Sequence, residues 1–267
     1  MHDEPEGVPI VVGIDGSPAA INAALWAATE AFHRHVPLRL VYAIGTEPTE
    51  GQPEFDCAET ALRTASAAVE SRGQLVKIET DVVRGDAATV LVDESRTASM
   101  VCLGSTGIGA VASRLRRSTV VDVARRAYCT VAIVRTPHVK PEPEADWIVV
   151  AVDDSAQDDS VVEFAMTEAS LRHAPILAVG VWSADFGDTP YDELDRRVQV
   201  WRDRHAGVHI HPVATTHATV ARFLAENPCE SVQLAVISSH NAHQVAHIVG
   251  PRHPVVSHGN CSVVVVR

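Results

Sequence analysis

Aromatic residues are scarce in this chain, making up only 4% of its 267 residues, although 46% of the residues are hydrophobic. A core with few large rings must be filled by Ala, Val, Leu and Ile. This composition favours β-branched strands covered by alanine-rich helices. Apolar runs are also short, and none approaches the roughly 18 residues that a membrane-spanning helix needs. The sequence therefore gives no reason to expect contact with a membrane.

Basic residues are also few compared with acidic ones. The chain has 22 Lys and Arg against 34 Asp and Glu, for a net charge of −12. Such a surface repels polyanions, so nucleic-acid binding is not expected. The five cysteines form no C-x-x-C pair, and the acidic N-terminus has no apolar segment typical of a secretory signal. These features predict a cytoplasmic protein with reduced thiols.

The sequence contains an internal repeat. The string IVVGIDGS at Ile10–Ser17 returns as IVVAVDDS at Ile148–Ser155, and CTVAIVR at Cys129–Arg135 is matched by CSVVVVR at Cys261–Arg267. Between these ends, a Thr-Glu-Ala triplet and a His-x-Pro triplet each occur in both copies, at the same offset that relates Ile10 to Ile148. Two copies of one domain, at 1–138 and 145–267, explain this pattern. The join between them is Pro-rich and charged, as a short linker is.

Apolar runs alternate with alanine-rich segments in both copies, which predicts a parallel sheet buried on both faces with helical crossovers. The expected strands are 9–14, 38–44, 75–83, 99–104 and 130–135, then 147–153, 175–182, 207–213, 232–238 and 261–267. The expected helices are 18–35, 54–72, 86–97 and 118–127, then 156–173, 190–205 and 217–226. Residues 240–258 have no clear pattern.

Two segments of the first copy are candidates for a ligand site, because ligands bind beyond the carboxyl ends of parallel strands. Asp15 ends the first strand, and either a ligand contact or a helix-capping role explains it. Gly104, Gly107 and Gly109 follow the fourth strand, where they allow close approach to an anion, and Ser118 opens the next helix. An ordinary surface loop is the alternative. The order of elements does not fit a dinucleotide fingerprint, and no P-loop motif occurs.

The strings VVGIDGS and LVYAI, and a loop spaced G-x2-G-x9-(G)-S, resemble the universal stress protein family in the tandem form common in actinobacteria. The resemblance implies two flavodoxin-like α/β domains (adenine nucleotide alpha-hydrolase-like), each a five-stranded parallel sheet in the order 3-2-1-4-5 with helices on both faces. It also implies a site in the N-terminal domain for ATP or a related adenine nucleotide. The implied contacts are Asp15 and Val41 at adenine, with Gly104, Gly107 and Ser118 around ribose and phosphate. Ser105, Gly109 and Arg117 of the same loop are further candidate contacts.

The chain departs from the family motif at Arg117, which stands where the third glycine is expected. The arginine side chain either blocks the approach of phosphate or pairs with it. The second copy keeps the acid as Asp153 but has lost all three glycine positions. We therefore expect a degenerate C-terminal domain that covers the edge of the first.

These features favour a stress-responsive regulator that binds an adenine nucleotide and a regulatory protein partner. The alternative is a scaffold in which neither site binds nucleotide. An enzyme ranks last, with slow ATP hydrolysis at most. The strands at 130–135 and 261–267 are expected to pair antiparallel as an intrachain pseudo-dimer, and a homodimer stays open. His240, His243 and His247 would share a helical face, but an exposed, pH-sensitive surface is favoured over a metal site.

Overall fold

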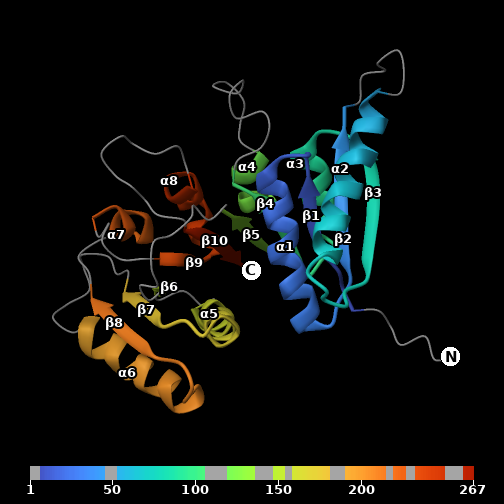
Figure 1. The fold of residues 1–267 in the computed structure, drawn as a ribbon. Coiled ribbons are helices and arrows are strands. Elements are labelled where there is room, and N and C mark those ends of the chain that lie inside the picture. The colour runs from blue at the N-terminus through green and yellow to red at the C-terminus, as the bar shows by residue number, and fades with distance from the viewer. Residues whose placement is uncertain are drawn as a thin grey trace. The chain divides into compact units, whose positions relative to one another are not determined.

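The computed structural model describes residues 7–45, 53–105, 119–135, 147–153, 158–180, 190–214, 219–226, 232–249 and 261–267. The chain divides into two compact units, Met1–Thr136 and Pro137–Arg267 (Figure 1). The linker expected between the two copies lies outside the described residues. The expected pairing of the strands at 130–135 and 261–267 concerns how the units sit together, and it stays a prediction.

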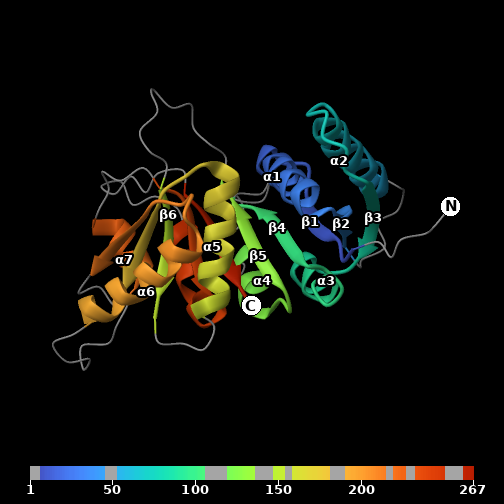
Figure 2. The same cartoon turned by 90° about the horizontal axis from the view of Figure 1, so that it is seen from below.

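The first unit is a five-stranded parallel sheet in the order β3-β2-β1-β4-β5. On one face, α1 lies over β1 and β4 and contacts α2, which lies over β2 and β3; α3 and α4 contact each other on the opposite face (Figure 2). The strands are β1 (Ile10–Ile14), β2 (Leu38–Ile44), β3 (Ile78–Arg84), β4 (Met100–Gly104) and β5 (Thr130–Val134). The helices are α1 (Pro18–Arg34), α2 (Pro53–Glu70), α3 (Ala87–Glu94) and α4 (Thr119–Arg126).

The second unit repeats this topology, with strand order β8-β7-β6-β9-β10. Its strands are β6 (Trp147–Val152), β7 (Ile176–Gly180), β8 (Ile210–Ala214), β9 (Val232–Ser238) and β10 (Ser262–Val266). Its helices are α5 (Asp158–Arg172), α6 (Pro190–Arg204), α7 (Val220–Glu226), the 3-10 turn η2 (Ser239–Gln244) and α8 (Val245–Val249). The duplicated fold predicted from the sequence is confirmed. The start of the unpatterned stretch at 240–258 is helical, which the sequence did not indicate.

Small side chains allow the helices to lie close to the sheet. Seven alanines of α1 are buried, and the strands beneath them contribute buried Val, Ile and Leu side chains. Val11, Val101 and Val131, from β1, β4 and β5, are at most 1% exposed. Burial of apolar area at this scale is the main favourable term in folding, at about 25 cal/mol per Å². The scarcity of aromatic residues is thus matched by an aliphatic core.

The repeated His-x-Pro triplets end the first helix of each unit. His35 and His173 have φ values of 55° and 51°, in the left-handed region that terminates helices. The backbone N–H of His35 returns to the carbonyls of Ala31 and Phe32. A non-glycine residue in this region is uncommon, although histidine is enriched there. Recurrence of the same conformation in both units explains why the triplet is kept.

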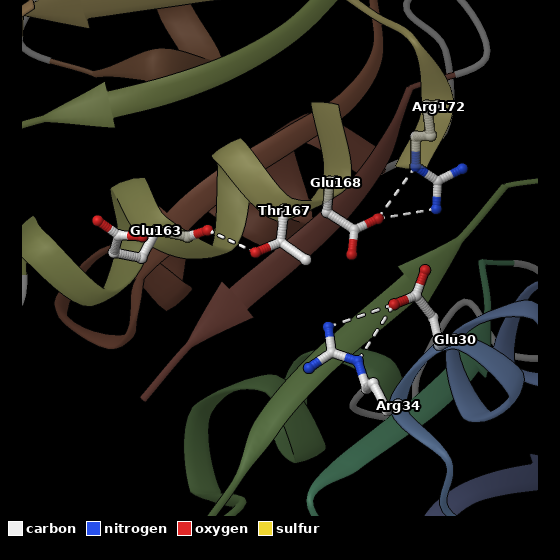
Figure 3. Close-up of polar contacts among 6 residues, drawn as sticks. All are labelled: Glu30, Arg34, Glu163, Thr167, Glu168 and Arg172. Atoms are coloured by element: carbon white, nitrogen blue, oxygen red, sulfur yellow. Dashed lines mark hydrogen bonds and ion pairs between the residues drawn. The ribbon is translucent and has the colours of Figure 1, made fainter. Parts of the chain in front are cut away.

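A buried carboxylate also recurs one turn before each of these helix ends. Glu30 and Glu168 are both fully buried. Arg34 donates to Oε2 of Glu30 at 3.2 Å, and Arg172 donates to Oε2 of Glu168 at 2.9 Å (Figure 3). A buried carboxylate is costly unless it is paired and hydrogen-bonded. The repeated Thr-Glu-Ala triplet therefore marks a charged pair at the same place in both units.

No helix among the described residues is long and apolar enough to cross a membrane. Four cysteines fall within the described ranges, and all four are free thiols. Cys102 and Cys261 are buried in or beside strands, whereas Cys57 on α2 is exposed.

Candidate functional site

The turn between β1 and α1 holds the acid predicted from the sequence. The Asp15 carboxylate accepts a hydrogen bond from the Ser17 N–H through Oδ1, at 2.9 Å. Gly16 makes this turn possible with a φ of 80°, a value that favours glycine. Ser17 is the N-cap of α1, since its Oγ accepts from Ala20 N–H at 3.1 Å. Asp15 therefore does not cap the helix itself, and its hydrogen bond to Ser17 fixes the direction of its carboxylate.

The end of β4 lies directly against the first turn of α1. A Cβ added to Gly104 would come within 2.5 Å of the Ala19 carbonyl carbon and 2.8 Å of the Ala20 nitrogen. These neighbours are backbone atoms, which cannot move aside as a flexible side chain can. Ser105 follows, and its N–H donates to the Val134 carbonyl at 2.9 Å. Helix packing alone thus requires a glycine at position 104, whether or not a phosphate also approaches there.

The end of β2 lies next to Asp15. Val41 pairs with Gly13 of β1 and is 1% exposed, so its side chain belongs to the core. Tyr42, one residue nearer the strand end, pairs with Ile14 and is half-buried. Burial raises the pKa of the Tyr42 phenol, and the charges of Cys57, Asp15 and Glu54 raise it further.

Tyr42 is a further candidate residue for this site, and the sequence analysis did not name it. Its pairing with Ile14 places it level with the end of β1, directly before the turn that holds Asp15. The only sequence signal was its place directly after Val41 at the end of a buried strand.

The structure brings some of the predicted contacts together and leaves others untested. β1 pairs with β2 on one side and with β4 on the other. Asp15 follows β1, Tyr42 of β2 pairs with the last residue of β1, and Gly104 ends β4, so the three lie on adjacent parallel strands. The strand order reverses at β1, and such a switch point is where open α/β sheets bind ligands. Four predicted contacts, Gly107, Gly109, Arg117 and Ser118, lie outside the described residues.

At the same edge of the second unit, the acid accepts hydrogen bonds from other residues of the unit. Asn241 of η2 donates from Nδ2 to Oδ2 of Asp153 at 3.1 Å and to Oγ of Ser238 at 3.2 Å. Gln244 donates from Nε2 to Oδ1 of Asn241 at 2.7 Å. The backbone carbonyl of Asp153 accepts from Arg197 of α6 at 3.3 Å. The acid at the end of β6 is therefore held by its own chain.

The histidines that follow are exposed. His240, His243 and His247 lie on η2 and α8 with their side chains in solvent, in line with the surface role favoured from the sequence. His243 contacts the backbone carbonyl of His240 through Nδ1 at 3.2 Å. Within the described part of the chain, no three His, Cys, Asp or Glu side chains gather in a way that could hold a metal ion.

Both units belong to the class of flavodoxin-like α/β domains with a five-stranded parallel sheet. The family model described as "Universal stress protein family" matches residues 9–135. Universal stress protein Rv2624c of Mycobacterium tuberculosis is 49% identical over 270 residues, which cover 99% of this chain and 98% of that protein. Universal stress protein Rv3134c of the same organism is 37% identical, covering 100% of this chain and 98% of its own length.

Among solved structures, a universal stress protein from Archaeoglobus fulgidus matches 97% of this chain and 96% of its own, with a TM-score of 0.71 and 14% identity. That match concerns the fold alone. Because relatives of 49% identity extend over nearly the whole length, the chain belongs to the universal stress protein family.

Proposed function

We propose that the N-terminal domain, residues 1–138, binds an adenine nucleotide, ATP or a close relative of it, and that the protein is a stress-responsive regulator rather than an enzyme. The observation that carries this proposal is the position of Asp15, Tyr42 and Gly104 on three adjacent strands, around the carboxyl end of β1 where the strand order reverses. Family membership supports it. Slow hydrolysis of ATP is the most turnover that we expect.

In this proposal the Asp15 carboxylate accepts a hydrogen bond from the amino group of adenine. Val41 and Tyr42 of β2 lie beside the base. The hydrogen bond from Ser17 orients the carboxylate before a ligand arrives. Ser105 and the loop residues Gly107, Gly109, Arg117 and Ser118 are proposed to surround ribose and phosphate. Residues 145–267 act as a degenerate, non-binding domain, which the occupied carboxylate of Asp153 favours.

The first test compares the two acids. We expect Asp15→Ala to weaken ATP binding by about 1–3 kcal/mol, because the amino group of adenine would lose a charged acceptor. Asp153→Ala is the matched control, and it should leave the affinity unchanged. Isothermal titration calorimetry on the full chain measures both. Equal effects from the two substitutions would refute the assignment of the site to the N-terminal domain.

A second variant separates ligand contact from turn stability. Asp15→Asn retains an oxygen that can accept from Ser17 N–H, so the turn should survive. The amide gives up the charge and presents a donor to the base. Affinity for ATP should therefore fall with Asp15→Asn while the unfolding temperature stays close to that of the parent protein.

The role of Arg117 is open to a direct test through Arg117→Gly, which restores the family's glycine. If the arginine pairs with phosphate, affinity for ATP should fall by about 1.5–3 kcal/mol and become less sensitive to salt. Adenosine binding should not change, because adenosine carries no phosphate. We expect this outcome, since Arg114 and Arg116 lie in the same segment of an otherwise acidic chain. A gain in ATP affinity would instead identify Arg117 as an obstruction.

A further inference from the structure

A chain of four hydrogen-bonding groups spans the strand-end edge of the second unit. Asp153 accepts from Asn241, and Asn241 accepts from Gln244. Gln244 in turn accepts through Oε1 from the backbone N–H of Ala221, in the first turn of α7, at 3.2 Å. The partners are 88, 3 and 23 residues apart in sequence. These hydrogen bonds therefore connect the end of β6 to η2 and α7.

This network is partly buried, and each of its donors has an acceptor. Gln244 and Ser238 are each 3% exposed. The Asn241 amide uses its NH₂ group toward Asp153 and Ser238 and its oxygen toward Gln244, so donors meet acceptors throughout. Partly buried polar groups that are satisfied in this way favour one arrangement, because breaking one hydrogen bond leaves its donor or acceptor short of a partner.

The contact between Asn241 and Asp153 has the chemistry of base recognition. A primary amide and the exocyclic amino group of adenine both present a planar NH₂ donor to a carboxylate oxygen. Asp153 is the repeat counterpart of Asp15, and Asn241 stands at the position that Gly107 occupies in the first copy. The loss of that glycine thus coincides with a side chain that reaches the acid.

We propose that Asn241 is an internal ligand of the C-terminal domain: its amide occupies the Asp153 carboxylate and excludes adenine nucleosides from it. The choice of adenine as the excluded base rests on the function proposed for the first domain. Gln244 is a positioning residue, since it orients the Asn241 amide and fixes it to α7.

The experiment uses the full chain carrying Asp15→Asn, which is expected to weaken binding to the first domain, with adenosine as the probe because it needs no phosphate loop. Adding Asn241→Gly should raise adenosine affinity on the order of tenfold, the gain expected when a competing hydrogen bond to a charged group is removed. Adding Asp153→Asn as well should abolish that gain. Adenosine should also raise the unfolding temperature of the Asn241→Gly protein and not that of its parent.

Two controls separate this proposal from a folding failure and from a failure of the site proposed in the first domain. If Asn241→Gly does not fold, Gln244→Ala leaves the Asn241 amide in place but removes its anchor, and it should give a smaller gain in the same direction. A folded Asn241→Gly protein with unchanged adenosine affinity overturns the proposal, and so does a gain that persists with Asp153→Asn. Failure of the proposed nucleotide site shows itself separately, as ATP binding that is indifferent to Asp15 in an otherwise unaltered chain.

Discussion

Replacing Gly104 by alanine is expected to destabilise the N-terminal domain by about 3 kcal/mol, at the upper end of the usual range for overpacking. The new methyl group would lie 2.5 Å from a backbone atom of Ala19, so β4 and α1 would have to separate. Gly45→Ala is the matched control, because a Cβ there meets nothing within 4 Å and the residue is exposed. Urea unfolding measures the difference, and hydrogen exchange in β1 and β4 assigns it to this domain.

The result bears on how glycine variants of the site are interpreted. If Gly104→Ala is destabilising, a loss of nucleotide binding in that variant reports on helix packing and not on a phosphate contact. Equal stability of the Gly104→Ala and Gly45→Ala proteins would show that β4 can shift without cost, and the close approach to Ala19 would then not explain the glycine.

The duplicated fold could be predicted because its signals are local or repeated. Buried strands such as Ile10–Ile14 are continuous apolar runs, and the second copy presents the same pattern independently. Most element ends agree with the expected ones within a few residues. β3 begins at Ile78 and not at residue 75, because the Val76 N–H donates to the Gln74 carbonyl in a local turn and the pairing with β2 starts only at Ile78.

The candidate site could be predicted only in part, because its remaining contacts join residues distant in sequence. Asp15 was found from its place at a strand end, and its hydrogen bond to Ser17 is local. The placement of Tyr42 near Asp15 depends on the pairing of β1 with β2. The reach of Asn241 to Asp153 spans 88 residues and depends on a helical turn that the polar sequence at 239–244 did not indicate.

The repeated Thr-Glu-Ala triplet is another feature whose structural role the sequence alone did not predict. The repeat was visible in the sequence, but burial of Glu30 and Glu168 was not, because charged residues are seldom fully buried. The arginine four residues later, Arg34 or Arg172, gives the local part of the explanation.

Arg34→Ala is expected to lower the free energy of unfolding by about 3 kcal/mol, the lower end of the range for breaking a buried ion pair on one side. The lower end applies because the Arg34 side chain is 34% exposed, whereas that of Glu30 is 1% exposed. The substitution removes the guanidinium that donates twice to Oε2 of Glu30 and leaves a buried carboxylate with weaker compensation. Arg172→Ala should have a similar effect in the second unit, where the Glu168 side chain is 0% exposed.

The exposed pair of Arg222 and Glu226 provides the control, since it has the same spacing of four residues but both side chains lie largely in solvent. Arg222→Ala should leave stability almost unchanged, because exposed ion pairs contribute little. Replacing both members of the buried pair, with Glu30→Leu and Arg34→Met together, should recover most of the stability lost with Arg34→Ala, because no uncompensated charge is then buried. Urea unfolding of these three single variants, the double variant and the parent protein gives the comparison. A double variant less stable than Arg34→Ala would mean that Glu30 makes contacts more valuable than its pairing with Arg34, and the charged pair would not be the reason that the triplet recurs.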